Sequence, residues 1–367
     1  AAGWFTFLEA GAMQRAARMF NLYQFLSDSR YRNKKLHEWD LSAGRTRLFS
    51  KPLYLQIEPT NCCNLECVMC ARPYYDEDAN RPGHMSMETF EKITPLIKSA
   101  EAVQLFGYGE PLVGKNFWRM LDRCAGLGVR TEIFTNGALL TPASSERLVA
   151  SGLGALTVSL DAATEGAFQA IRKTSLNSIL ENLKALNEAK VKLKKNNPAL
   201  RISFVLMRDN IGELEGLIDI AAGLGVTDVN VSNMMVYSKE MDCQSAFHFQ
   251  DEATKVLDDA ARKAKALGIN LTPPSFGPGV ADCLMPFNML FINWDGKVRP
   301  CCSAAFVSEK YSLPIGDVNR QPLDEVWNSE KMQKIRRGLL GKGEMPPQCA
   351  GCGFRVKDIR AYRRYLD

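Results

Sequence analysis

Between residues 53 and 267 the sequence repeats one pattern, in which a short apolar stretch is followed by a longer amphipathic one. Such an alternation is typical of buried strands joined by helices that present one apolar face. Strands are expected at 53–58, 102–106, 129–134, 156–160, 201–206 and 228–232. Parallel strands need crossover connections, so the pattern predicts a parallel sheet with helices outside. Six units, rather than the eight of a closed barrel, predict an α/β fold of the partial (β/α)6 barrel type.

A Pro- and Gly-rich break at 273–279 ends this pattern and predicts a domain boundary. We expect an N-terminal helical extension at 1–50, the partial barrel at 51–272, and a small domain with a final helix at 273–367. The helix of the extension is expected to pack on the barrel. The alternative is an interfacial or partner-binding helix.

The composition argues against several classes of protein. Hydrophobic residues make up 46% of the chain and charged residues 24%, as in an ordinary globular protein. The net charge of +5 is too small to indicate a nucleic-acid partner, and no apolar run is long enough to span a membrane. The 11 cysteines gather near the two ends of the chain, which favours metal sites in a reducing compartment over disulfides. We therefore expect a cytoplasmic protein.

The first predicted strand runs into a loop that carries Cys63, Cys67 and Cys70 at C-x3-C-x2-C spacing. Thiolates are the ligands of iron–sulfur clusters, and three of them on one loop can hold a cuboidal cluster whose fourth iron stays open to another molecule. A zinc or redox loop is the alternative, which the unequal spacing fits less well. Cys62 leaves the register open, because it forms a C-x4-C pair with Cys67.

This loop resembles the signature of the radical S-adenosylmethionine (SAM) enzymes. The resemblance implies a catalytic 4Fe–4S cluster on the three cysteines, with the amino and carboxylate groups of SAM on its open iron. It also implies cleavage of SAM to a 5′-deoxyadenosyl radical, and an electron donor such as flavodoxin or ferredoxin. One departure is Met69, which stands where the family usually has an aromatic residue.

A second motif follows the second predicted strand and resembles the family's Gly-Gly-Glu-Pro motif, with a tyrosine in place of the second glycine. Its residues are Gly107, Tyr108, Gly109, Glu110 and Pro111. The resemblance implies that the carbonyl groups of this turn and the Glu110 carboxylate receive the ammonium group of SAM. In isolation, the same residues would be read as an ordinary Gly/Pro turn.

Ser159 and Asp161 end the fourth predicted strand, and Arg172 follows in the next helical segment. The resemblance implies that Ser159 and Arg172 hold the carboxylate of SAM, a role that suits the bidentate guanidinium group. Asp161 is expected to reach the ribose hydroxyls of SAM or to cap the following helix.

The C-terminal segment carries a second set of cysteines. A turn at 295–296 between two apolar stretches predicts a hairpin, which would bring Cys283 and Cys301 together. Cys349 and Cys352 add a second pair on a tight loop. Four cysteines without histidine fit a closed iron–sulfur or zinc site.

This segment resembles the SPASM and twitch domains that follow many radical SAM barrels. The resemblance implies one auxiliary 4Fe–4S cluster on these four cysteines, closer to the twitch type because the chain lacks the further cysteines of a full SPASM domain. The Gly-x4-Cys register favours Cys301 over its neighbour Cys302 as the ligand. Zinc is the alternative occupant.

Three functions fit these motifs. The first hypothesis is a radical SAM oxidoreductase or epimerase that dehydrogenates or epimerises a small polar metabolite, such as a sugar or an aminocyclitol. The alternative is a maturase that modifies a peptide or protein side chain, although residues 1–50 look short for a separate leader-peptide-binding domain. A non-catalytic metal-binding protein is the third.

Cys243 follows the sixth predicted strand, at the expected active-site end of the sheet. Related epimerases use a lone cysteine to return a hydrogen atom to a substrate radical, which makes Cys243 a candidate catalytic residue. An incidental free thiol is the alternative.

Overall fold

The computed structural model describes residues 23–74, 81–276, 282–302, 313–353 and 355. The strands of the barrel are β1 (Tyr54–Ile57), β2 (Ala102–Leu105), β3 (Arg130–Thr135), β4 (Ala155–Ser159), β5 (Ala199–Leu206), β6 (Asp228–Asn233) and β7 (Asn270–Thr272). Each pairs in parallel with the next. The predicted strands and the partial-barrel fold class are therefore confirmed.

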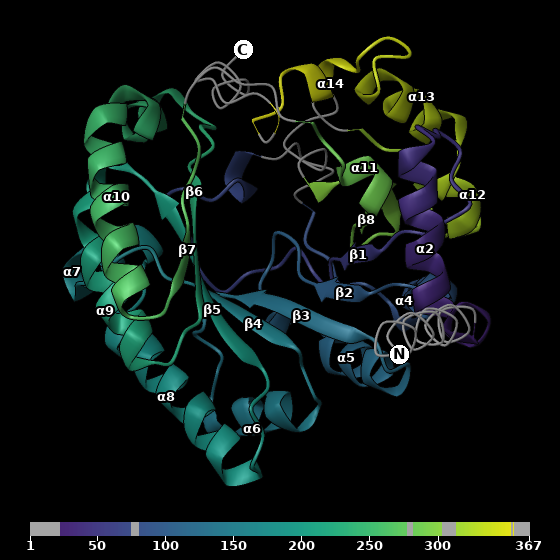
Figure 1. Cartoon of the computed structure of the whole chain (residues 1–367). Helices are drawn as coiled ribbons and strands as arrows, with labels where there is room; N and C mark the ends of the chain where they lie inside the picture. Colours follow the sequence, from purple (N-terminus) through teal and green to yellow (C-terminus); the bar gives the residue numbers. More distant parts are fainter. Residues whose placement is uncertain (1–22, 75–80, 277–281, 303–312, 354, 356–367) are drawn as a thin grey trace, which may run out of the picture.

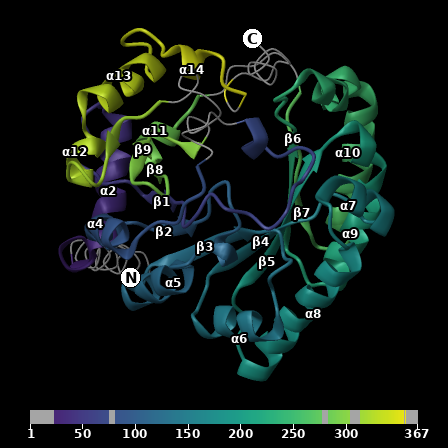
Figure 2. The same cartoon turned by 180° about the vertical axis from the view of Figure 1, so that it is seen from behind.

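The connecting helices are α4 (Met87–Ile97), α5 (Phe117–Gly126), α6 (Pro142–Ala150), α7 (Glu165–Arg172), α8 (Leu176–Leu193), α9 (Leu214–Gly223) and α10 (Gln250–Ala266). They lie along the outer side of the curved sheet, as Figures 1 and 2 show. In α4 the Ser86 hydroxyl accepts a hydrogen bond from the Thr89 N–H at 3.0 Å, which caps the first turn. Its apolar face, with Phe90, Ile93 and Ile97, is fully buried.

One strand of the barrel differs from the expectation. β7 was not predicted, because only Leu271 in this three-residue strand is apolar and the segment shows no period. Before α9 begins, Arg208–Glu213 forms a 3-10 turn. The Asn210 side chain accepts a hydrogen bond from the Met207 N–H at 2.7 Å, which favours the tighter turn.

The C-terminal segment joins the same sheet, which has the order β10-β9-β8-β1-β2-β3-β4-β5-β6-β7. Its elements are α11 (Met285–Asn288), β8 (Met289–Ile292), β9 (Lys297–Arg299), β10 (Gly316–Asp317), α12 (Leu323–Trp327), α13 (Glu330–Leu339) and α14 (Pro347–Ala350). β8 pairs in parallel with β1 and antiparallel with β9. Gly296, in the turn between β8 and β9, has φ +91°, which favours glycine. The predicted hairpin is therefore present and extends the barrel sheet.

Helix α2 (Ser29–Ser42) makes up half of the described part of the N-terminal extension. The Asn33 amide donates to the carbonyl groups of Lys51 and Ser99, each at 3.1 Å. The Trp327 indole N–H donates to the Ser50 carbonyl at 2.7 Å. These bonds attach the segment to the barrel and to α12, while the bounds of the three domains stay predictions. In the part of the chain that the structure describes, no helix has the length and apolar character needed to cross a membrane.

Candidate functional site

The loop that follows β1 places Cys63, Cys67 and Cys70 close enough for their charges to interact. All three thiols are partly buried. Burial raises the pKa values of Cys67 and Cys70, because a thiolate loses its hydration there, and the neighbouring thiols add to the rise. The three cysteines therefore form one group in which ionisation needs compensation from nearby donors or from a metal.

Two side chains from other elements supply such donors. The Asn136 amide, just after β3, lies 3.8 Å from the Cys63 sulfur. The Arg172 guanidinium, at the end of α7, lies 3.5 Å from the Cys67 sulfur. Arg172 lowers the pKa of Cys67 and so opposes part of the effect of burial.

Cys62 faces different groups. Its sulfur lies 3.9 Å from the Gly83 carbonyl and 4.0 Å from the His84 ring. Its neighbour Cys63 faces Asn136 instead. Cys62 and Cys63 thus have different neighbours, and the assignment of Cys63, Cys67 and Cys70 as the ligands stays a prediction.

A buried ion pair holds Arg172 in place. Asp161 is fully buried, accepts a hydrogen bond from the Val205 N–H at 2.6 Å, and pairs with the Arg172 guanidinium. Burial raises the pKa of Asp161, and Arg172 counters part of that rise. Burial disfavours the charged guanidinium, but Asp161 and Cys67 outweigh this, so the pKa of Arg172 is raised. Asp161, which we expected at the SAM ribose or a helix cap, instead orients Arg172.

Ser159 is the last residue of β4 and lies beside Ser203 of β5 in the sheet register. It is partly buried. The strand thus delivers Ser159 and Asp161 to the same end of the sheet, with Arg172 bound to the second of them.

The turn after β2 packs directly on the cysteine loop. The Glu110 N–H donates to the Cys62 carbonyl at 2.9 Å. A Cβ atom added at Gly109 would lie 2.4 Å from the carbonyl oxygens of Thr60 and Cys62, so no larger residue fits there. A Cβ atom at Gly107 would lie 2.4 Å from the Glu58 side chain. Both glycines are therefore required by close approach of the backbone.

The Glu110 carboxylate is directed into the protein. It is 3% exposed and accepts hydrogen bonds from the Asn136 N–H (2.8 Å), the Thr135 hydroxyl (2.8 Å) and the Leu112 N–H (3.2 Å). Burial raises the pKa of Glu110 to about 7, although these donors oppose the rise. We expected this carboxylate to receive the ammonium group of SAM. The structure uses it to connect the turn to β3.

Tyr108 reaches from the same turn toward the C-terminal cysteines. Its hydroxyl donates to the Cys302 carbonyl at 2.8 Å, and its ring centroid lies 5.8 Å from that of Phe291 in β8. The residue that replaces a glycine of the family motif therefore links the two parts of the site.

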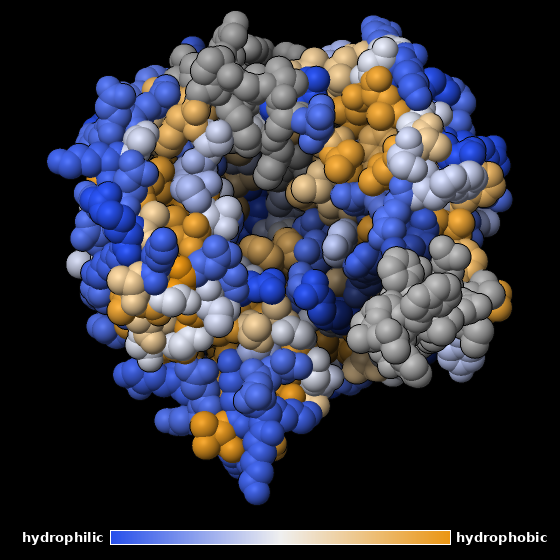
Figure 3. Space-filling model, viewed as in Figure 1, coloured by the Kyte–Doolittle hydropathy of each residue, from blue (hydrophilic) through white to orange (hydrophobic). Residues whose placement is uncertain are grey.

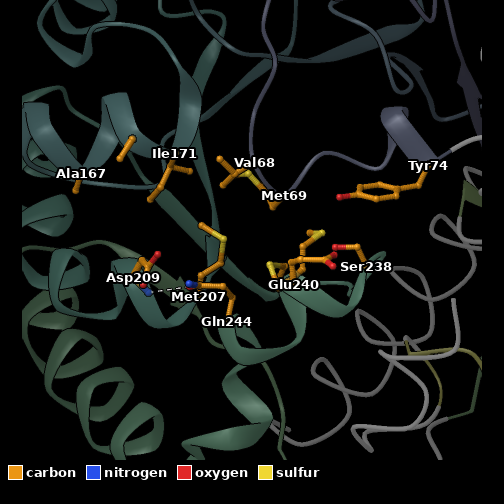
Figure 4. A pocket seen from close by; sticks show the side chains of 13 residues that line it. Val68, Met69, Tyr74, Ala167, Ile171, Met207, Asp209, Ser238, Glu240 and Gln244 are labelled. Carbon is orange, nitrogen blue, oxygen red and sulfur yellow. Dashed lines mark hydrogen bonds between the residues drawn. The ribbon is translucent and has the colours of Figure 1, made fainter. Parts of the chain in front are cut away.

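A cavity of about 410 Å³ opens beside the cysteine loop and is termed the methionine cavity. Four methionines line it, namely Met69, Met207, Met234 and Met241. Figure 4 shows Val68 and Met69 of the loop on one side of this cavity and Met207 and Asp209 on another. This cavity could not be predicted beyond Met69, because the other methionines come from separate strand ends and from the turn Lys239–Gln244.

Cys243 lies on that turn and is exposed. Its thiol faces the Glu240 carbonyl at 3.5 Å. Its neighbours Met241 and Gln244 line the methionine cavity, whereas Cys243 does not. Its role as a hydrogen donor stays a prediction that this geometry does not support.

The C-terminal cysteines surround a second cavity. Cys283, Cys301, Cys349 and Cys352 all line it, and Cys302 does not. Burial raises the pKa of Cys283, with a further rise from Cys352 and an opposing effect of Arg355. In the described residues, no three histidine, cysteine or carboxylate side chains converge as ligands of a single ion. The four cysteines line one cavity, so a cluster held by them would lie there.

Residues 57–221 match the family model of the Radical SAM superfamily, and residues 283–353 match that of the iron–sulfur cluster-binding SPASM domain. The chain therefore belongs to the radical SAM superfamily and carries a SPASM domain at its C-terminal end. These two domains imply SAM and 4Fe–4S clusters as cofactors.

Three curated relatives match most of the chain. The tungsten-containing aldehyde ferredoxin oxidoreductase cofactor-modifying protein of Pyrococcus furiosus is 25% identical over 321 residues, covering 82% of this chain and 87% of its own. A PqqA peptide cyclase of Granulibacter bethesdensis is 26% identical over 320 residues (84% and 81%). The mycofactocin maturase MftC of Mycobacterium tuberculosis is 28% identical over 317 residues (82% and 75%).

Solved structures share the fold. SuiB of Streptococcus suis has a TM-score of 0.66 at 17% identity, covering 90% of this chain and 79% of that chain. A structure of anSMEcpe with bound AdoMet has a TM-score of 0.61 at 17% identity, covering 83% and 88%.

The expectation of a sugar or aminocyclitol substrate, with dehydrogenation or epimerisation as the outcome, is wrong. The matched relatives include peptide cyclases and a maturase instead. The cysteine motifs misled because they determine how the radical is made, and the same cofactor chemistry serves many substrates.

The packing of Gly109 on the cysteine loop can be tested with Gly109→Ala. The added methyl group would collide with two backbone carbonyls, which cannot rotate away, so the loop must move. We expect the variant to lose roughly half or more of the iron of the wild type after anaerobic reconstitution, because its three-cysteine group is displaced.

The matched control is Gly126→Ala, where an added Cβ would meet nothing within 4 Å. Iron content and SAM binding should match the wild type in this control. Full iron content in Gly109→Ala would contradict the proposed packing constraint.

Proposed function

We propose that this protein is a radical SAM maturase that modifies a peptide or a protein side chain. The observation that supports it most directly is the extent of the likeness to a peptide cyclase and a maturase, which includes 82–84% of this chain. The likeness therefore extends beyond the barrel into the C-terminal segment, where a maturase would hold its auxiliary cluster. Peptide substrates are further supported by the structure of SuiB bound to its precursor peptide SuiA.

In this proposal Cys63, Cys67 and Cys70 hold the catalytic cluster. When bound, the cluster and SAM supply the radical that removes a hydrogen atom from the substrate. The chain's own contribution is to place donors at two of the thiols, Asn136 at Cys63 and Arg172 at Cys67, and Arg172 opposes part of the rise that burial causes in the pKa of Cys67.

Arg172 and Ser159 are proposed to bind the carboxylate of SAM, and the carbonyl groups of Gly107, Tyr108 and Gly109 its ammonium group. Glu110 and Asp161 are proposed as positioning residues. Their carboxylates are bound to the protein's own donors and fix the turn after β2 and the guanidinium.

The methionine cavity is proposed to take the adenine of SAM. Thioether side chains pack well against the face of an aromatic ring and adapt to its shape. Met69 lies next to the cluster-binding Cys70, so an adenine in this cavity would be near the loop that holds the cluster.

Cys283, Cys301, Cys349 and Cys352 are proposed to hold an auxiliary 4Fe–4S cluster. They surround one cavity, and together they provide the four thiolates of a closed cluster. This ligand set leaves no open iron, so the auxiliary site would exchange electrons rather than bind substrate.

The choice between Cys301 and Cys302 can be tested by iron analysis. We expect about eight iron and eight sulfide ions per chain in the wild type, and about four of each in Cys301→Ala. Cys302→Ala should keep about eight, because its side chain does not line the cavity. About four iron ions with one zinc in the wild type would instead assign the site to zinc.

The role of Asp161 can be tested with Asp161→Asn. The substitution removes the counter-charge of Arg172 while keeping an oxygen for the Val205 N–H. We expect SAM affinity of the reconstituted protein to fall by about tenfold, or about 1.4 kcal/mol, with iron content unchanged. Asp219→Asn, in the exposed pair with Lys263, is the control. Unchanged SAM affinity in Asp161→Asn would reject the positioning role.

The substrate class can be tested with a short peptide encoded beside the gene, prepared with deuterium at its side-chain carbons. We expect deuterium to enter 5′-deoxyadenosine and the mass of the peptide to change, because the radical removes a hydrogen atom from the peptide. Cys63→Ala should show neither effect. Deuterium transfer from a labelled sugar, with none from the peptide, would contradict the proposal.

A further inference from the structure

A groove of about 380 Å³ lies in the C-terminal domain. It is next to the cavity lined by Cys283, Cys301, Cys349 and Cys352, which is termed the auxiliary cavity. Apolar side chains form much of the lining of the groove, namely Leu313, Pro314, Ile315, Ile335, Met345 and Pro346. Figure 3 shows apolar residues gathered on this side of the molecule, near α13 and α14 of Figure 1. Gln348 lines both the groove and the cavity of the four cysteines. A molecule in the groove is therefore separated from the thiols by about one side chain.

Two lysines of α13, Lys331 and Lys334, also line the groove, together with the single acid Glu344. Lys331 is exposed, and its ammonium group lies 3.4 Å from the Pro314 carbonyl. Lys334 pairs with Glu344 at 4.0 Å, where their side chains are 65% and 82% exposed. An ion pair that is this exposed and this long contributes little to stability. The charge of Lys334 therefore stays available to a partner. The charged residues of the lining are thus two lysines and one glutamate, which leaves a net positive charge at the groove.

The groove and the methionine cavity share no lining residue. An occupant of the groove therefore contacts the auxiliary side of the site rather than the SAM side. The reacting carbon of the substrate must reach the SAM side, so the substrate is a poor candidate for this groove. A molecule that exchanges electrons with the auxiliary cluster alone is a better one.

We propose that this groove docks an acidic one-electron carrier protein of the flavodoxin or ferredoxin class. An apolar centre with a basic rim suits such a partner, because redox encounters use small interfaces that charge complementarity steers. The carrier loses one electron to the auxiliary cluster, no bond forms or breaks, and no proton moves. The proposal rests on the assignment of a cluster to the auxiliary cavity, and it does not depend on the identity of the substrate.

The test is the double variant Lys331→Glu/Lys334→Glu in the reconstituted holoenzyme. Binding of an oxidised acidic flavodoxin is titrated by calorimetry at low ionic strength. We expect the dissociation constant to rise by about tenfold or more, since two attractive charges become repulsive. The difference should shrink as salt is added, because surface charges are screened. The rate at which reduced flavodoxin bleaches the visible absorption of the holoenzyme should fall in parallel.

The matched control is Lys184→Glu/Lys192→Glu on α8, which lies across the molecule from α13 in Figures 1 and 2. These lysines also pair with exposed acids, Glu181 and Glu146, so the control changes the net charge equally. Wild-type affinity in this control, with weakened binding in the groove variant, supports the docking site. Equal losses of affinity in both variants would mean that only the net charge of the protein matters. That result would overturn the proposal.

Two further outcomes would overturn the proposal. One is wild-type affinity in the groove variant. The other is displacement of flavodoxin by a peptide substrate, which would assign the groove to the peptide. Because the titration uses oxidised flavodoxin and needs no turnover, a failure of the cluster assignment is seen separately, in the iron content.

Discussion

A buried carboxylate at the end of β1 joins the two parts of the candidate site. Glu58 is 1% exposed and accepts hydrogen bonds from the Tyr108 N–H (2.9 Å), the Asn293 amide (3.1 Å) and the Trp294 N–H (3.2 Å). Burial raises its pKa, and these three donors counter part of the rise. A buried carboxylate without such donors would be costly, so the turn after β2 and the C-terminal hairpin are both held to one strand end.

The same electrostatic problem recurs at the cysteines, where burial raises the pKa of thiols that must ionise to bind metal. The chain meets it with an alternating series of charges. Asp161 compensates Arg172, and Arg172 lies against the Cys67 sulfur. The Arg172 guanidinium thereby favours the thiolate of Cys67 on one side and the carboxylate of Asp161 on the other. Asp161 thus affects the surroundings of the Cys67 thiol through Arg172.

The features that could be predicted from the sequence are those that depend on residues close together in the chain. The strands follow from apolar stretches, and the cysteine group from its spacing on one loop. The methionine cavity could not be predicted, because Met207 and Met234 follow different strands and meet only in the folded chain. For Glu110 the motif could not indicate the direction of the carboxylate, which depends on Thr135 and Asn136 of another unit.

Tyr108 shows how a departure from the family motif is accommodated. On each side of it stands a glycine, at which an added Cβ would lie 2.4 Å from neighbouring atoms. The middle residue meets no such limit, because its side chain extends toward the C-terminal cysteines and its hydroxyl reaches the Cys302 carbonyl. A glycine at position 108 could keep the backbone hydrogen bond to Glu58 but would lose the hydrogen bond to the Cys302 carbonyl. The tyrosine therefore adds a second connection between the SAM-side turn and the segment that leads from Cys301, independent of the sheet pairing between β1 and β8.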